Sequence, residues 1–169
     1  TCHKACLCRS SEEDGRMNKM KKKLTEKEFK SIYTRVPRVC VELVIIQKNK
    51  VLLTKRSIVP FKGFWHFPGK GVLFREKIND VIKRVAKREL GVKVIPQKFL
   101  GYAEYLHDGF RHSVSLVFKC KIKGNQQPTT LEQTSSFQFF NKIPKHTIPY
   151  HKKFLKIHLK ELLGKNKIS

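Results

Sequence analysis

One carboxylate, Glu89, is spaced from a turn of small and aromatic residues in a way that suits phosphate chemistry. The turn runs from Trp65 to Gly71 and contains Pro68-Gly69. Glycine lets the main chain come close to a ligand. Four apolar residues between the turn and Glu89 have helical spacing, and Gly91 is a helix stop signal: Ile78, Val81, Ile82 and Val85. The predicted helix carries Glu89 back beneath the turn, an arrangement that suits a metal-bound phosphate.

This segment resembles a Nudix box, whose family pattern is G-x5-E-x7-R-E-U-x-E-E-x-G-U, with U a bulky aliphatic residue. Five residues match the pattern in register: Glu76, Arg84, Glu89, Gly91 and Val92. The resemblance implies that Glu76 and Arg84 pair and brace the loop against the helix. A charged pair with good geometry can do this.

Three residues depart from the pattern. Lys70 replaces the opening glycine, Val85 replaces the glutamate after the arginine, and Arg88 replaces the first glutamate of the final pair. The usual carboxylates lie on one helix face and share divalent cations. Because one of three anions remains, the charge balance argues against a cluster of two or three Mg²⁺ ions.

A narrower resemblance, over roughly residues 37–155, is to the GDP-mannose mannosyl hydrolase branch of the Nudix family. That branch also lacks the two upstream carboxylates and keeps the glutamate before Leu-Gly. It implies one Mg²⁺, with Mn²⁺ as an alternative, held by Glu89, the carbonyl of Gly69 and Gln133. A surface-loop amide is the alternative interpretation of Gln133.

The same resemblance implies three substrate contacts. Arg56 matches a diphosphate-contacting arginine with a catalytic role, although a solvated arginine is the alternative. Glu42 stands where the branch has an aspartate near the substrate, and partnership with a buried lysine is the alternative. Lys70 can supply a phosphate contact as a point charge.

The expected general base is absent. The GDP-mannose branch has a histidine directly after the metal-binding glutamine, where this chain has Thr134. A threonine hydroxyl is too weak a base at neutral pH. Four residues are candidate substitutes, although a lone histidine is more often structural or solvated: His107, His112, Glu104 and Glu132.

The elements that must position these residues are readable from periodicity. Thr25 and Glu28 form a capping box, which predicts a short helix that buries Phe29, Ile32 and Tyr33. Alternation and apolar runs predict strands at 39–46, 51–56, 92–94, 99–105, 113–122 and 137–140. A helix over 78–90 and another opening at Ile148-Pro149 complete the set. The predicted fold is α/β (α+β): a Nudix-like α/β/α sandwich with a mixed sheet, a central loop-helix-loop and a C-terminal helix.

The chain of 169 residues allows one domain, expected at 17–169. Residues 1–16 are interpreted as a disordered leader or a misplaced start. A metal knuckle of Cys2, His3, Cys6 and Cys8 is the less favoured interpretation, because a second ligand pair at suitable spacing is missing. Cys40 and Cys120 are expected to be reduced thiols in strands. No apolar run is long enough for a membrane span or signal peptide, so a cytoplasmic location without membrane contact is expected.

Charge leaves two function hypotheses open. The chain has 37 Lys and Arg against 13 Asp and Glu, a net charge of +24. Such a surface attracts polyanions, including RNA, in a sequence-independent way, although scattered solvated lysines are the preferred interpretation. The first hypothesis is a Mg²⁺-dependent Nudix hydrolase of a nucleoside diphosphate derivative, such as a nucleotide sugar. The alternative is a catalytically impaired module that binds nucleotide or RNA; a homodimer is also left open.

Overall fold

The computed structural model describes residues 24–108, 111–130 and 134–164. It contains three helices and seven strands in these ranges: α1 (Glu26–Tyr33), β1 (Arg38–Gln47), β2 (Lys50–Arg56), β3 (Trp65–His66), β4 (Gly69–Gly71), α2 (Ile78–Leu90), β5 (Val94–Asp108), β6 (Arg111–Ile122), β7 (Thr134–Phe140) and α3 (Pro149–Leu162). The leader expected at residues 1–16 and its cysteines lie outside the described residues.

Strand β1 is the centre of a mixed sheet, because three other strands pair with it along its length. It pairs in parallel with β6 over Arg38–Ile45 and antiparallel with β4 over Cys40–Glu42, and its end meets β2. Strand β5 pairs antiparallel with β6, and β3 and β7 pair with β2. The sheet order is β3-β2-β1-β6-β5, with β4 and β7 off this path.

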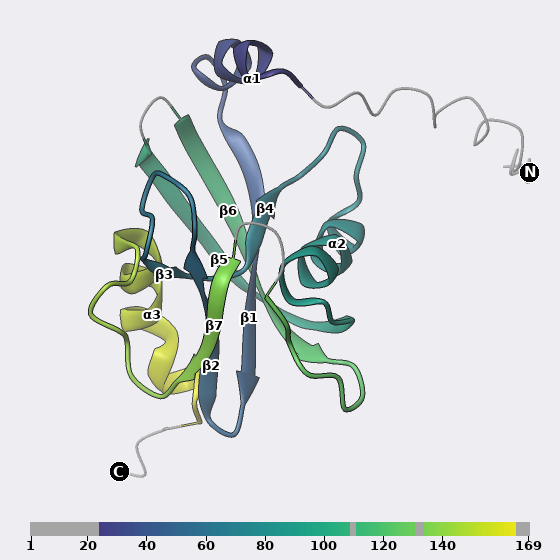
Figure 1. Ribbon diagram of the computed structural model, residues 1–169, viewed down its shortest axis with the longest axis vertical. Helices are drawn as coiled ribbons and strands as arrows, with labels where there is room; N and C mark the ends of the chain where they lie inside the picture. Colours follow the sequence, from purple (N-terminus) through teal and green to yellow (C-terminus); the bar gives the residue numbers. More distant parts are fainter. Residues whose placement is uncertain (1–23, 109–110, 131–133, 165–169) are drawn as a thin grey trace, which may run out of the picture.

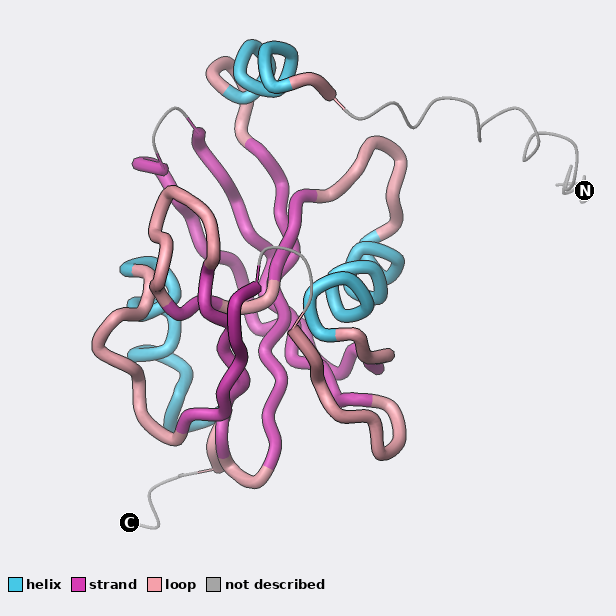
Figure 2. The backbone as a smooth tube through the Cα atoms, in the orientation of Figure 1, coloured by secondary structure: helices cyan, strands magenta, loops and turns pink. Residues whose placement is uncertain are grey.

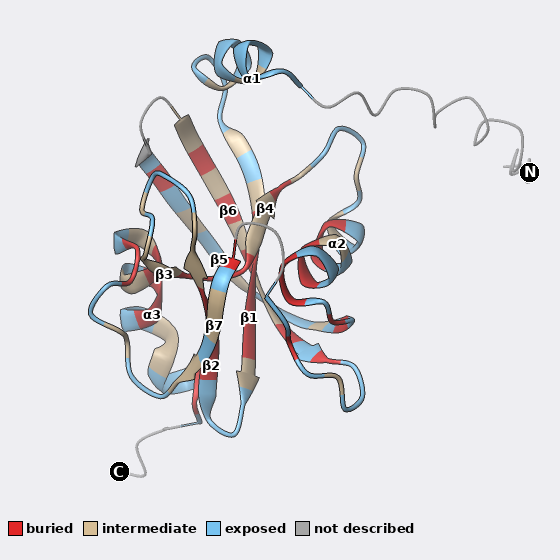
Figure 3. Cartoon of the chain, viewed as in Figure 1, coloured by how far each residue is buried: buried red, intermediate tan, exposed pale blue. Residues whose placement is uncertain are grey.

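Helices α2 and α3 cover opposite sides of the sheet, as Figure 1 shows. Alternate residues of β1 face the two helices, so Val41, Leu43 and Ile45 pack with α2 while Val44 packs with α3. The buried residues follow β1 and the inner faces of both helices (Figure 3). The predicted α/β/α sandwich is therefore confirmed.

The ends of the helices follow from their sequences. Thr25 and Glu28 form the predicted capping box at the start of α1. Gly91 ends α2 with a φ of 67°, a left-handed conformation that glycine adopts without a steric penalty. Pro149 opens α3, where its missing N–H has no helical partner to lose. The loop before α2 extends away from the sheet, and α2 then lies beside the sheet (Figure 2).

Two expectations about elements are wrong. Helix α1 has no buried residue: Ile32 is 40% exposed, while the adjacent rings of Phe29 and Tyr33 lie under the Arg38 guanidinium. The helix thus contacts a cation through two rings instead of joining the core. The two predicted strands at 92–94 and 99–105 are one long strand, β5, because irregular pairing at Pro96/Lys98 accommodates the proline.

Cys40 and Cys120 are free thiols, as expected. Among the described helices, none combines the length and the apolar character needed to cross a membrane.

Candidate functional site

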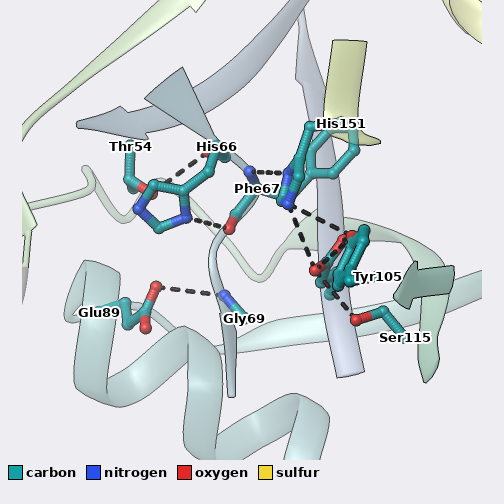
Figure 4. A network of polar contacts seen from close by, with 9 residues as sticks. Thr54, His66, Phe67, Gly69, Glu89, Tyr105, Ser115 and His151 are labelled. Carbon is teal, nitrogen blue, oxygen red and sulfur yellow. Dashed lines mark hydrogen bonds and ion pairs between the residues drawn. The ribbon is translucent and has the colours of Figure 1, made fainter. Parts of the chain in front are cut away.

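The Glu89 carboxylate lies beneath the Pro68-Gly69 turn. Glu89 is in the last turn of α2 and is 3% exposed. Its Oε2 accepts a hydrogen bond of 3.2 Å from the Gly69 N–H (Figure 4). Its Oε1 is 3.5 Å from the Lys70 Nζ. The helix therefore brings a buried anion to the main chain of the turn.

The register of β4 explains why Gly69 meets this carboxylate. Gly69 lies opposite Glu42. The hydrogen bonds between β1 and this segment lie at other pairs: the Leu43 N–H donates to the Pro68 carbonyl, and the Val72 N–H donates to the Val39 carbonyl. Gly69 is thus in a non-hydrogen-bonded pair, so its N–H and its C=O both point away from β1, toward the same side. Since the N–H meets Glu89, the carbonyl leaves the strand on the carboxylate's side.

No side chain can replace the hydrogen of Gly69. A Cβ there would be 2.7 Å from the Glu42 Cγ and 3.0 Å from the Val41 carbonyl oxygen. The absence of a side chain lets Glu42 lie against one face of the turn.

The predicted pair of Glu76 and Arg84 is confirmed. Arg84 donates from Nε to Glu76 Oε1 at 2.6 Å and from Nη2 to Oε2 at 2.7 Å. Its Nη2 also donates to the Gly71 carbonyl at 2.9 Å, while Glu76 accepts from the Leu73 N–H. This two-point ion pair joins the loop and β4 to α2.

A second polar cluster surrounds Glu42. The Tyr105 hydroxyl is 2.8 Å from both Glu42 oxygens, and the Ser115 hydroxyl donates to Oε1 at 3.1 Å. The His151 Nε2 of α3 is 3.5 Å from Glu42 Oε1 and 3.3 Å from the Tyr105 oxygen. These partners answer the question left open about Glu42: the described contacts are with hydroxyls and an imidazole, not with a lysine.

The proton on His151 is assigned from its neighbours. The Phe67 N–H donates to His151 Nδ1 at 2.9 Å, so Nδ1 is the unprotonated nitrogen. Nε2 then carries the proton and points at Tyr105 and Glu42. Burial lowers the pKa of His151 to about 3, and the Arg56 cation contributes. His151 is therefore neutral at physiological pH and fixes α3 to the main chain of the turn.

His66 lies on the other side of Phe67. Its Nδ1 donates to the Phe67 carbonyl at 2.7 Å, and its Nε2 is 3.4 Å from the Thr54 hydroxyl. Burial is the main cause that lowers the pKa of His66 to about 3, so it is also neutral. Both polar groups of Phe67 thus contact an imidazole, and Figure 4 shows the turn passing between Glu89 and Tyr105.

Glu42 is the group of this cluster that titrates near neutrality. Burial raises the pKa of Glu42 to about 7, against the opposing hydrogen bonds from Tyr105 and Ser115. Burial, with the Glu42 charge, raises the pKa of Tyr105 well above its usual value. The cluster can therefore gain or lose one proton at neutral pH beside Gly69.

Arg56 lies at the end of β2, half-buried. Its Nε donates to the Pro60 carbonyl at 2.6 Å and is 3.1 Å from the Ile58 carbonyl oxygen. It also lies close enough to His66 and His151 to lower the pKa of both. The structure therefore places this guanidinium beside the histidine pair and fixes it to the loop that precedes the turn.

Two of the four predicted substitutes for the general base, Glu104 and His112, have side chains that the structure describes. Glu104 is exposed, and it alternates with the inward-facing Tyr105 on β5. His112 lines a pocket of about 150 Å³ with the end of α1 and the residues after it. Gln133, Glu132 and the side chain of His107 lie outside the described residues. Thr134 is buried at the start of β7, paired with Arg56.

The donors at this turn fit a single hard cation. Within the described part of the chain, no group of three or more His, Cys, Asp or Glu residues could hold a metal ion. Glu89 and the Gly69 carbonyl, which leaves β4 on its side, supply hard oxygen donors, and Mg²⁺ needs only one or two carboxylates. The fit is thus to one ion, as the residues of the box suggest.

Several residues of the site have no signal in the sequence. Tyr105, Ser115 and His151 belong to β5, β6 and α3, and only the tertiary fold brings them to Glu42. His66 is inside the turn, but its role depends on Thr54 of β2. The alternation of Ser115 with apolar residues along β6 is the one feature of the sequence that could have drawn attention to it.

Known proteins resemble this chain. The profile of the NUDIX domain family matches residues 36–155. The chain is 31% identical over 127 residues to an ADP-ribose pyrophosphatase of Methanocaldococcus jannaschii, covering 73% of this chain and 74% of that protein. It is 38% identical over 86 residues to the low-salt glycan biosynthesis protein Agl8 of Haloferax volcanii, covering 51% of this chain. This match spans only 55% of the Haloferax protein's length.

Solved structures share the fold. The MutT NUDIX hydrolase from Burkholderia pseudomallei superposes with a TM-score of 0.65 and 23% sequence identity. The match covers 72% of this chain and 97% of that one. At this identity the likeness concerns the arrangement of helices and strands.

Proposed function

The chain belongs to the NUDIX domain family, and from that membership we propose that it hydrolyses a nucleoside diphosphate linked to a sugar, with one Mg²⁺ at Glu89. Mn²⁺ is the expected substitute ion. The proposed ligands are Glu89, the Gly69 carbonyl and Gln133, which resemble the set of the GDP-mannose mannosyl hydrolase branch.

The observation that carries the proposal is the buried contact between Glu89 and the turn. A carboxylate that is 3% exposed needs partners, and its Oε2 takes one from the Gly69 N–H. An ordinary surface glutamate at a helix end would face solvent instead. The Glu76–Arg84 pair supports the same assignment, because it fixes the loop between the turn and α2.

The substrate class rests on the relatives together with the residues. The Methanocaldococcus relative is named for a pyrophosphatase of ADP-ribose, a nucleoside diphosphate joined to a sugar, and the Haloferax relative is named for glycan biosynthesis. The resemblance to the GDP-mannose branch points to the same chemical class. A diphosphate is also the group that a guanidinium such as Arg56 and an ammonium such as Lys70 recognise.

Each residue has a proposed task. A bound divalent ion supplies positive charge that stabilises the diphosphate leaving group. Arg56 and Lys70 bind phosphate oxygens, and Arg56 is oriented by its bonds to the Ile58 and Pro60 carbonyls. Glu42 lies against the opposite face of Gly69, where it contacts substrate and exchanges a proton near neutral pH.

The test is a panel of nucleoside diphosphate sugars, ADP-ribose and nucleoside triphosphates, each with and without Mg²⁺. Release of free sugar indicates that water attacks the sugar carbon. Formation of terminal phosphate monoesters indicates that water attacks phosphorus. We expect Mg²⁺-dependent turnover of at least one diphosphate sugar. Glu89→Gln should lower it by about 10²-fold or more, the scale on which one electrostatic contact acts in an active site.

Glu161→Gln is the matched control, because Glu161 is 63% exposed and pairs with Lys98 at the surface. It should leave turnover unchanged. Equal activity of the Glu89 and Glu161 variants would remove Glu89 from the ion site. A wild-type protein that turns over no compound of the panel would contradict hydrolysis and favour the nucleotide-binding module.

A further inference from the structure

Lys70 projects toward Glu89 because of its place in β4. Side chains alternate along a strand, so the positions of Gly69 and Gly71 face Glu42 and Arg38, while Lys70 faces the other way. That side is the one covered by α2. Its Nζ is 3.5 Å from the Glu89 Oε1, and the two side chains are 18% and 4% exposed.

We propose that the Lys70 ammonium is a built-in counter-cation of Glu89, which a divalent ion must displace before it binds. Lys70 therefore sets the metal concentration at which the site fills. The inference rests on the proposed function in one respect, namely that Glu89 is the ion's carboxylate ligand.

The two oxygens of Glu89 carry the argument. Oε2 accepts from the Gly69 N–H, whereas Oε1 faces the ammonium. A buried carboxylate is unfavourable without a compensating partner, and Lys70 supplies positive charge at this place. A divalent ion at the same oxygen would be within a few ångströms of the ammonium, so the two cations repel each other and compete.

Lys70 is also able to leave. A lysine carries its charge on a flexible stem of four carbons, and this side chain is partly exposed, so the ammonium has a path to solvent. The family pattern has a glycine at this position, which has no side chain to compete. The replacement therefore adds a competing cation to a site that has lost two carboxylates.

The test measures ion binding directly. Mn²⁺ titrations followed by electron paramagnetic resonance, without substrate, give the Kd for the wild type, Lys70→Met and Lys70→Arg. We expect Lys70→Met to bind Mn²⁺ about tenfold more tightly or better, because a charge within this distance changes the affinity for a second charge on that scale. Lys70→Arg keeps the charge and should retain the weaker affinity of the wild type.

Lys83→Met is the matched control. Lys83 is on α2 and 66% exposed, so its replacement lowers the net charge equally without touching Glu89. Its Kd should equal that of the wild type. Lys70→Gly, which restores the residue of the box, is a second neutral variant in case methionine disturbs folding.

A thermal readout is independent of the titration. In EDTA, Lys70→Met should melt at a lower temperature than the wild type, because Glu89 has lost its cation. Saturating Mn²⁺ should then raise its melting temperature more than that of the wild type, since ligand binding to the folded state stabilises it according to affinity.

Equal Kd values for the wild type and both neutral variants would overturn the inference, as would weaker binding by those variants. Absence of Mn²⁺ binding in every protein would overturn it together with the ion assignment. Failure of the substrate panel leaves the comparison of Kd values valid. Magnesium-dependent turnover with unchanged Kd values contradicts the role of Lys70 alone.

Discussion

Glu42 is a buried acid that contacts three side chains from different elements. Tyr105 and Ser115 donate to its oxygens, and His151 approaches Oε1. Burial nevertheless dominates and raises the pKa of Glu42 from 4.5 to about 7. The folded chain therefore binds a proton here that the unfolded chain has already released at pH 6.

Replacing Glu42 by Gln should remove part of the pH dependence of stability. Between pH 4.5 and about 7 the folded state binds more protons at Glu42 than the unfolded state, so the stability from this group is lost as pH rises. Relative to the wild type, the free energy of unfolding of Glu42→Gln should rise by about 3 kcal/mol across this window, because folding changes the proton affinity of Glu42 more than a hundredfold and each tenfold change is equivalent to about 1.4 kcal/mol.

Urea unfolding of both proteins at several pH values measures this difference. His66 and His151 have lowered pKa values and act with the opposite sign, so their stabilisation is lost as pH falls. They are present in both proteins, and their contribution cancels in the difference. Parallel stability curves for the two proteins would show that Glu42 has an ordinary pKa.

Among single residues, those of the box could be predicted from the sequence and those of the buried cluster could not. Glu76, Arg84 and Glu89 lie within one loop and one helix, where spacing fixes which side chains meet. Glu42 could be placed near the site only by resemblance. Its neighbours Tyr105 and His151 come from elements whose packing no local pattern specifies.

At the scale of elements, α3 holds the turn in place through one imidazole. The Phe67 N–H is buried and donates to His151 Nδ1, while the Phe67 ring also packs against His151 and Phe154. Helix α3 thus acts on the same turn that α2 meets through Glu89. The turn is fixed from both sides of the sheet.

His151→Phe should loosen this contact without a large change in volume. The Phe67 N–H would lose its acceptor, which costs about 1–3 kcal/mol for a buried donor. We expect that loss in urea unfolding and faster hydrogen exchange at the Phe67 amide. His158→Phe, a change on the same helix at a residue that packs on Phe154, should alter neither quantity. Similar effects of the two changes would mean that α3 acts by packing alone.

Elements differ in how far sequence specifies them. Helix α2 was predicted to its last residue, because its apolar period and Gly91 are local signals. Strand β5 was predicted as two pieces, since Pro96 marks a break unless the partner strand bulges around it. The exposed side of α1 was also missed, because an amphipathic pattern indicates a buried face and not what covers it.

For the whole molecule, charge determines association with polyanions. At +24, mixed-sequence RNA should bind weakly and lose affinity at least about tenfold between roughly 50 and 200 mM salt, because counterions are released from phosphates. Single-stranded DNA of equal length should behave alike. Fluorescence anisotropy over a salt series measures both. A preference for one RNA sequence that persists at high salt would indicate a dedicated nucleic-acid site.

The layered architecture was predictable because segments with the apolar spacing of strands and segments with the apolar spacing of helices follow one another along the chain. The order of strands was not. The parallel pairing of β1 with β6 joins Arg38 to Ser113, and its register depends on the intervening chain as a whole. Resemblance to the Nudix box predicted a mixed sheet but neither its strand order nor its register.

The acceptor for the Phe67 amide stands 84 residues further along the chain. During synthesis on the ribosome, the turn at Phe67 and helix α2 are therefore made long before the imidazole that contacts the turn. A nascent chain that has exposed the whole box still has an open donor at Phe67 until α3 emerges from the exit tunnel. The contacts of this turn are thus complete only after α3 has been made.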